Sequence, residues 1–163
     1  ILAYKGAKEV TIELNSLSKT FNMAGWRVGM VLGNKENINN ILQVKSNMDS
    51  GMYYGIQQGA IAALKLSDDW FEKMNMVYKE RRKIVWEICD TLGCVYDKDS
   101  VGLFVWAKVP EGKSAIELTD DLLYNKNVFI TPGMIFGSNG DNYIRFSLCI
   151  KEEKIKEVLK RIL

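Results

Sequence analysis

Histidine is absent from the 163 residues, and cysteine is scarce. Without histidine the chain cannot build a Ser-His-Asp triad, and almost every mixed zinc site is excluded as well. The three cysteines stand at positions 89, 94 and 149, an odd number at unrelated spacings that does not indicate a disulfide framework. We therefore expect all three to be small core residues.

The chain also lacks a strong charge of either sign and any long apolar run. Its formal net charge is +2 and no long basic segment is present, so nothing favours binding to nucleic acid. The uncharged apolar runs are much shorter than the about 20 residues of a membrane span, and no secretory signal is visible. We expect a cytoplasmic protein without nucleic-acid or membrane partners. Because the chain begins with Ile1 rather than Met, we also expect it to be a piece of a longer protein.

What remains is a globular composition that can bury a sizeable core. Apolar runs at 10–14 and 28–32 predict two strands that are covered on both faces, with a loop at 15–26 between them. Helices are predicted at 35–47 and 56–65, joined by a loop at 48–55. This order is typical of the end of an α/β sheet domain, which we place at residues 1–66.

The pattern changes at Ser67, which opens a long predicted helix that ends near Leu92, before Gly93. Within this helix the run KERRK at 79–83 predicts a solvated face. Ser114 and Glu117 form a capping box at the start of another helix. The remaining predicted elements are strands at 94–96, 103–108, 128–130 and 143–149, a turn at 132–133, and helices at 114–125 and 151–163. We expect residues 67–163 to form a smaller α+β unit built on the long helix.

The segment SLSKTFNMAGWRVG, residues 16–29, contains the candidate binding residues. Lys19 follows the first predicted strand, where loops of α/β sheets line ligand crevices, and Arg27 starts the next strand. Ser16, Ser18 and Thr20 surround the lysine with hydroxyl groups. If the two strands lie close together, both cations reach the same edge, and an anion such as phosphate is the natural ligand between them.

Two common phosphate motifs do not fit this segment. A P-loop requires glycine at the positions of Glu13 and Ser18, and GWRVG lacks the G-x-G-x-x-G arrangement of dinucleotide sites. Another candidate is Arg145 in YIRFSL, where strand alternation places Ile144, Phe146 and Leu148 on one face and the arginine on the other. A planar guanidinium suits a carboxylate, although a solvent-facing strand arginine has the same pattern.

The order S-x-S-K and then an arginine eight residues later, with a glycine on either side of it, resembles the lysine segment of class I/II aminotransferases of fold type I, which use pyridoxal phosphate. The sequence of this segment is similar to that of the branch that contains LL-diaminopimelate, aspartate and alanine aminotransferases. KSNMDSGMYYGIQQGAIAAL at 45–64 resembles the next loop and helix of the diaminopimelate branch. TPGMIFGSNGDNYIRFSL at 131–148 resembles the family's P-G-x-x-F-G…R-x-S segment. The resemblance covers nearly the whole chain.

The resemblance implies the end of a fold type I large domain in residues 1–66, joined by a long helix to a small α+β domain in 67–163. It also implies pyridoxal-phosphate-dependent transfer of an amino group from an amino acid to a 2-keto acid by a homodimer. Lys19 would be the catalytic residue, which carries the cofactor as a Schiff base and then moves a proton. Ser16, Ser18 and Arg27 would bind the cofactor, and Arg145 the substrate carboxylate.

The family's aspartate against the pyridine nitrogen, its tyrosine and its stacked aromatic ring have no counterpart in residues 1–9. We therefore expect these 163 residues alone to be inactive, or to form a weak and non-productive Schiff base.

A carbon–sulfur beta-lyase and a non-catalytic dimerisation or binding module remain as alternatives. Phe136 lines the pocket or belongs to the core. Tyr53 and Tyr54 contribute across a dimer interface or simply pack. The sequence does not identify the amino-acid donor or the 2-keto-acid acceptor.

Overall fold

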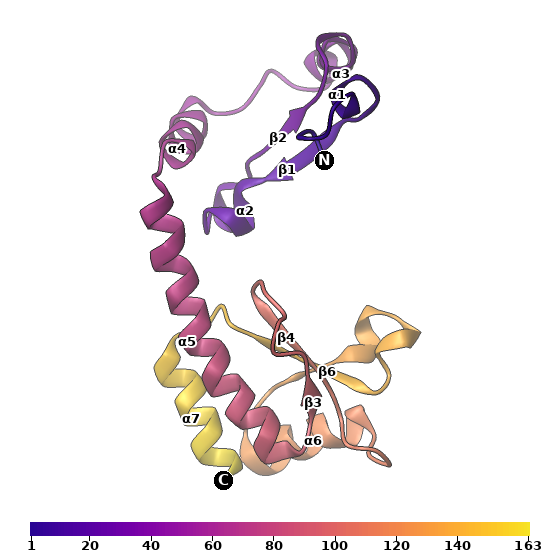
Figure 1. The fold of residues 1–163 in the computed structure, drawn as a ribbon, viewed down its shortest axis with the longest axis vertical. Coiled ribbons are helices and arrows are strands. Elements are labelled where there is room, and N and C mark those ends of the chain that lie inside the picture. The colour runs from indigo at the N-terminus through magenta and orange to yellow at the C-terminus, as the bar shows by residue number, and fades with distance from the viewer. The chain divides into compact units, whose positions relative to one another are not determined.

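The computed structural model describes residues 1–163, which divide into two compact units, Ile1–Ser67 and Asp68–Leu163 (Figure 1). The first unit contains α1 (Ala7–Val10), β1 (Glu13–Ser16), α2 (Leu17–Thr20), the 3-10 helix η1 (Ala24–Trp26), β2 (Gly29–Leu32), α3 (Lys35–Met48) and α4 (Tyr54–Leu64). The second contains α5 (Asp68–Leu92), β3 (Val95–Tyr96), β4 (Phe104–Lys108), α6 (Ala115–Lys126), β5 (Thr131–Pro132), the 3-10 helices η2 (Gly133–Phe136) and η3 (Ser138–Gly140), β6 (Tyr143–Ser147) and α7 (Glu152–Ile162).

The first unit is organised around an antiparallel ribbon in which β1 pairs with β2. The predicted strand at 28–32 is confirmed, but the one at 10–14 is largely wrong, because Ala7–Val10 forms α1 and strand pairing begins only at Glu13. The expectation that both strands are covered on both faces is also wrong for this chain. Leu14 is 79% exposed, since the ribbon has only two strands and the small core of this unit does not include this side chain.

The loop predicted at 15–26 contains two short helical turns instead. Ser16 caps α2, because its Oγ accepts a hydrogen bond from the backbone N–H of Ser18 at 3.2 Å. The small core of this unit consists of Leu17, Met23, Val28 and Ala63. Leu17 from α2 and Val28 next to β2 both belong to this core, which anchors the turn at the end of the ribbon.

The helices predicted at 35–47 and 56–65 are confirmed as α3 and α4. Asn34 begins α3, since its Oδ1 accepts a hydrogen bond from the N–H of Asn37 at 2.8 Å. In the second unit, α5 confirms the long helix predicted to end before Gly93, which adopts a left-handed φ of 71°. The Cys94 N–H donates to the Cys89 carbonyl at 2.8 Å, which closes the helix in the manner of a Schellman motif.

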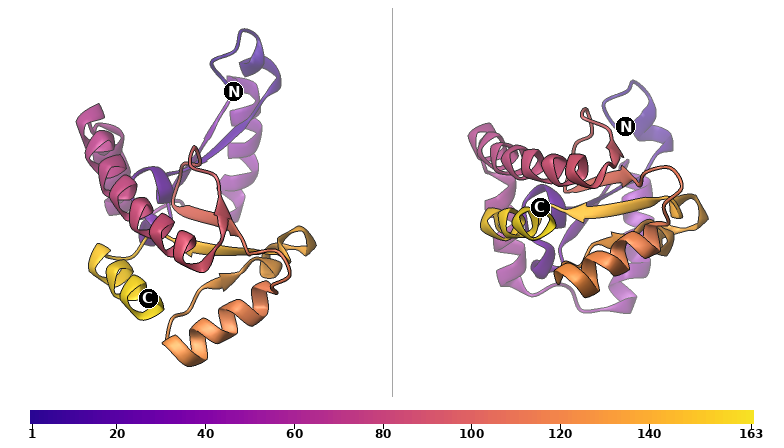
Figure 2. Two further views of the ribbon diagram at one scale, coloured as in Figure 1. Left: turned by 60° about the horizontal axis from the view of Figure 1, so that its bottom comes forward. Right: turned by 90° about the horizontal axis from the view of Figure 1, so that it is seen from below.

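The second unit contains a four-stranded antiparallel sheet in the order β3-β4-β6-β5. Helices α5, α6 and α7 cover one face of it (Figure 2). The strand residues on the covered face are Val105, Ala107, Ile144 and Phe146, and they pack against side chains such as Ile88, Leu122 and Ile155 from the three helices. The predicted alternation in 143–149 is confirmed, because Ile144, Phe146 and Leu148 are all buried.

Three further expectations need correction. The predicted strand at 128–130 lies outside the sheet, where pairing with β6 begins at Thr131 and continues through Pro132. The run at 79–83 is not wholly solvated, because Arg81 and Arg82 are half-buried and donate to the carbonyl oxygens of Leu148 and Gly102. Cys89 and Cys94 are core residues, but Cys149 is exposed, and all three thiols are free. No helix combines the length and the apolar character needed to cross a membrane.

Candidate functional site

The register of the β1–β2 ribbon determines where the segment 16–29 places its functional groups. Ser16, the last residue of β1, lies opposite Gly29, the first residue of β2, and the Leu17 N–H donates to the Val28 carbonyl at 3.2 Å. The turn that follows β1 and the turn that precedes β2 therefore lie at the same end of the ribbon. Lys19 belongs to the first turn, and Arg27, two residues before Gly29, belongs to the second.

The two serines near Lys19 form a short hydrogen-bond chain. The Ser16 hydroxyl donates to the Ser18 Oγ at 3.0 Å and accepts from the Ser18 backbone N–H. Lys19 is the third residue of α2, is exposed to solvent, and makes no hydrogen bond or ion pair within the chain. Its ammonium is therefore free to meet a ligand, and hydroxyl groups are available one and three residues before it.

Arg27 has a strained backbone position at the other side of this end of the ribbon. It adopts a left-handed φ of 52°, which non-glycine residues rarely do, and it directly follows η1. Its Nη1 donates to the Ala24 carbonyl at 2.8 Å, which uses one of the five guanidinium donors and leaves the side chain exposed. Such strain is often kept at ligand sites, where the surrounding structure stabilises it.

The functional groups at this end of the ribbon are of the types that bind a phosphorylated aldehyde. A primary amine can condense with the aldehyde, and two hydroxyls and a guanidinium are the donors that bind phosphate best. We call Ser16, Ser18, Lys19 and Arg27 the Lys19 group. That the ammonium and the guanidinium converge on one ligand stays a prediction. The structure brings the two turns together, and it places Arg145 in the other unit.

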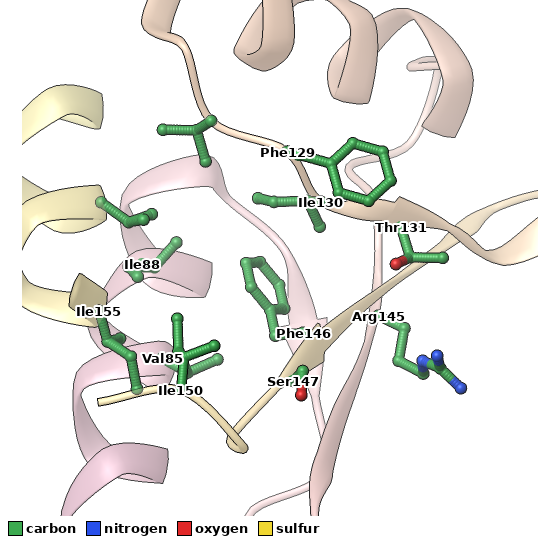
Figure 3. Close-up of a pocket in the computed structure, with 12 residues that line it drawn as sticks. Val85, Ile88, Phe129, Ile130, Thr131, Arg145, Phe146, Ser147, Ile150 and Ile155 are labelled. Carbon is green, nitrogen blue, oxygen red and sulfur yellow. The ribbon is translucent and has the colours of Figure 1, made fainter. Parts of the chain in front are cut away.

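Arg145 lies in the centre of β6, on the face of the sheet opposite the helices. Its neighbours across the sheet are Trp106 on β4 and Thr131 on β5. Figure 3 shows its side chain leaving β6 on the side away from Phe146. Its guanidinium makes no hydrogen bond or ion pair within the chain, so the side-chain N–H groups have no acceptor there. The guanidinium is therefore available for an external carboxylate.

Two phenyl rings hold the guanidinium of Arg145. The Arg145 Cζ lies 4.2 Å from the ring centroid of Phe104 and 4.0 Å from that of Phe136. Of the two expectations for Phe136, pocket lining or core, the core is wrong, because the side chain is 49% exposed and contacts Arg145. Gly137, which follows it, has a φ of 124° that favours glycine. Sequence reasoning missed Phe104, although the alternation in FVWAK places Phe104 and Trp106 together on the uncovered face of the sheet.

A cavity of about 270 Å³ lies on the helix side of the same strand. Its interior is lined largely by apolar side chains, among them Val85, Ile88, Phe146 and Ile155 (Figure 3). Thr131, Arg145 and Ser147 complete the lining, and no residue of the Lys19 group borders this cavity. Tyr53 and Tyr54, for which the sequence leaves two roles open, are both exposed, at 76% and 70%.

Comparison with known proteins identifies relatives along the whole chain. The family described as "Aminotransferase class I and II" matches residues 3–162. LL-diaminopimelate aminotransferase of Aquifex aeolicus is 41% identical over 162 residues, which are 99% of this chain and 42% of that protein. The enzyme of the same name from Maridesulfovibrio salexigens is 40% identical over 162 residues, with the same coverage of both chains.

Solved structures show the same relationship. The apo structure of BacF from Bacillus subtilis has a TM-score of 0.85 and 38% identity, and the match covers 99% of this chain and 44% of BacF. A probable N-succinyldiaminopimelate aminotransferase from Thermus thermophilus also has a TM-score of 0.85, with 32% identity and coverage of 99% and 43%. The chain thus spans about two fifths of the length of the relatives it matches. It belongs to the class I and II aminotransferase family.

Proposed function

We propose that the protein containing this chain is a pyridoxal-phosphate-dependent aminotransferase, which transfers an amino group from an amino acid to a 2-keto acid. The observation that carries the proposal is the β1–β2 register, which puts the turns of Lys19 and Arg27 at one end of one ribbon. In this proposal residues 1–66 belong to the large cofactor domain, and residues 67–163 form the long helix and the small domain. The enzyme works as a homodimer in the cytoplasm.

The Lys19 group binds the cofactor. When bound, pyridoxal phosphate supplies an aldehyde that condenses with amines and a ring that withdraws electrons. Lys19 would hold it covalently through Nζ. Whenever its Nζ is free, Lys19 would act as the general base and acid that moves the proton of the substrate α-carbon. Ser16 and Ser18 donate hydroxyl hydrogen bonds to the phosphate, and Arg27 adds charge-assisted ones.

Arg145 binds the carboxylate that all amino-acid and 2-keto-acid substrates share. Its guanidinium has no acceptor within the chain, and its planar fork of donors matches the two oxygens of a carboxylate. Because this contact ignores the substrate side chain, the choice of donor and acceptor depends on other residues.

The experiment is covalent trapping of the cofactor on the 163-residue chain. The chain is incubated with pyridoxal 5'-phosphate, reduced with borohydride, digested and mapped by mass spectrometry. We expect the pyridoxyl group on Lys19, no adduct at this position in Lys19→Ala, and an undiminished Lys19 adduct in Lys35→Ala, where another exposed lysine of the same unit is removed. We expect no transamination by the chain alone. Labelling spread evenly over the surface lysines would refute the assignment of Lys19.

A matched pair of aldehydes tests the phosphate contacts separately. Arg27→Ala should lower the yield of the Lys19 adduct with pyridoxal 5'-phosphate by about tenfold, the usual effect of losing one charge-assisted contact. With pyridoxal, which lacks the phosphate, the same substitution should change the yield little. Equal losses with both aldehydes would mean that Arg27 supports the local fold and does not contact the phosphate.

A further inference from the structure

The guanidinium of Arg145 is enclosed from two directions by aromatic rings. The ring centroids of Phe104 and Phe136 both lie about 4 Å from its Cζ, at 4.2 and 4.0 Å. The two rings make no contact with each other, although each contacts the same small group. They therefore approach the guanidinium from different directions, and its N–H groups, which have no acceptor within the chain, remain available to a ligand.

Each ring has its own support. Phe104 lies on β4, opposite Ser147 and two pairs along from the Trp106–Arg145 pair, on the same face of the sheet, so the sheet itself holds it beside the arginine. Phe136 comes from η2 and packs edge-to-face on Trp106, with the ring centroids 5.9 Å apart and the planes at 67°.

Trp106 is in turn fixed by its own neighbours. It stacks on Tyr143, with the ring centroids 5.3 Å apart and the planes at 14°. Gly133, the first residue of η2, lies so close to Trp106 that an added Cβ would be 2.8 Å from its ring. The close approach of η2 to the sheet thus depends on this glycine. This close approach holds Phe136 in place.

We propose that Phe104 and Phe136 are positioning residues that make Arg145 selective for planar carboxylates over tetrahedral oxyanions. The proposal rests on the proposed function, in which Arg145 is the carboxylate site. The five N–H donors of a guanidinium lie in one plane, and a carboxylate places its carbon and both oxygens in that plane. A sulfonate that binds through two oxygens directs its third oxygen out of the plane. On this site that oxygen meets the face of a phenyl ring, which carries partial negative charge.

The test uses propionate and ethanesulfonate, which have the same chain length and the same charge of −1 at neutral pH. Each is titrated into the ¹⁵N-labelled 163-residue chain at constant ionic strength, and the Nε–Hε signal of Arg145 is followed by NMR. The signal is assigned to Arg145 because it should be missing from the spectrum of Arg145→Lys. We expect propionate to bind at least about fivefold more tightly than ethanesulfonate, a preference that a bidentate in-plane contact can supply.

Substitution of the rings decides whether they cause the preference. In Phe136→Leu and in the double variant with Phe104→Leu, the ratio of the two affinities should fall to about one, because the faces of the guanidinium are then open. Phe136→Tyr keeps a ring over Arg145 and should keep the ratio. Tyr124→Leu, which removes a ring that is 76% exposed on α6, is the control and should leave it unchanged. Because Phe136 is half-exposed, the single variant is expected to fold even if the double variant does not.

The outcomes separate this inference from the proposed function. Equal binding of the two anions by the unsubstituted chain, binding of neither, or an unchanged preference in Phe136→Leu would each overturn the inference. None of these titrations contains cofactor, so trapping at Lys19 can succeed or fail independently of them. A preserved propionate preference together with failed trapping would leave the anion site standing and remove the aminotransferase proposal.

Discussion

The two units of this chain use apolar residues in opposite ways. In the second unit fifteen buried residues form one continuous core between the sheet and its three helices. In the first unit only four residues are buried, and large apolar side chains such as Val10 and Leu14 are 84% and 79% exposed. Similar apolar runs therefore give a closed core in one unit and an open ribbon in the other. An apolar strand becomes buried only when another layer covers it.

The largest expected effect comes from truncating a leucine in each unit. Leu148 is fully buried, so Leu148→Ala should lower the free energy of unfolding of its unit by about 3 kcal/mol, through lost burial and the cavity left behind. Leu14→Ala removes the same atoms from an exposed position and should cost less than about 0.5 kcal/mol. Urea titrations followed by circular dichroism measure both. A similar loss in the two variants would contradict the contrast between the units.

A smaller effect is expected from adding one methyl group to a glycine in each unit. In Gly133→Ala the new Cβ would lie 2.7 Å from the Tyr143 carbonyl oxygen and even closer to that of Gly140, so η2 must shift. We expect a loss of about 2 kcal/mol, typical of overpacking. Gly25→Ala in the first unit meets nothing within 4 Å and should be neutral or slightly stabilising. The near-ultraviolet circular dichroism of the Trp106 stack should change only in the first variant.

The same contrast explains which elements could be predicted from the sequence. The end of α5 and the start of α6 have local signals, a glycine at 93 and the Ser114 cap, and both predictions hold. Strand limits depend on partners far along the chain, so pairing at Glu13 and Thr131 could not be located from apolar runs alone. Burial is also non-local, which is why the expectation of Cys149 in the core is wrong.

The candidate site likewise has a part that could be predicted from the sequence and a part that could not. Lys19, Arg27 and Arg145 could be selected as candidates from the sequence, because their residue types and spacing match motifs. The register that brings the turns of Lys19 and Arg27 together is set by the pairing of β1 with β2, which the residues of the loop between them do not reveal. The rings around Arg145 come from β4 and η2, and only their arrangement in space reveals that Phe104 and Phe136 act on one guanidinium.

The smallest expected effect is a pH dependence that only the second unit should show. Burial raises the pKa of Cys89 to about 12 and that of Cys94 to about 11, from 9.0 for an ordinary thiol. Both thiols favour the folded state fully below pH 9, and this contribution is lost as the pH rises toward the folded values, because only the unfolded chain then releases the protons. We expect about 1 kcal/mol per thiol between pH 8 and 10. The first unit has no cysteine.

Matched cysteine variants isolate this effect in urea titrations at pH 8, 9 and 10. Cys94→Ala should be less stable than the parent at pH 8 but should lose less stability as the pH rises, since one of the two thiols is gone. Cys149→Ser changes an exposed thiol and should keep the parent's slope with pH. Burial raises the pKa of Tyr96 to about 12, with help from its hydrogen bond to Asp90, so this residue acts in the same direction as the thiols. If Cys94→Ala and Cys149→Ser flatten the slope equally, Cys94 is not closed off from water, and the interior of the second unit is as open as the ribbon of the first.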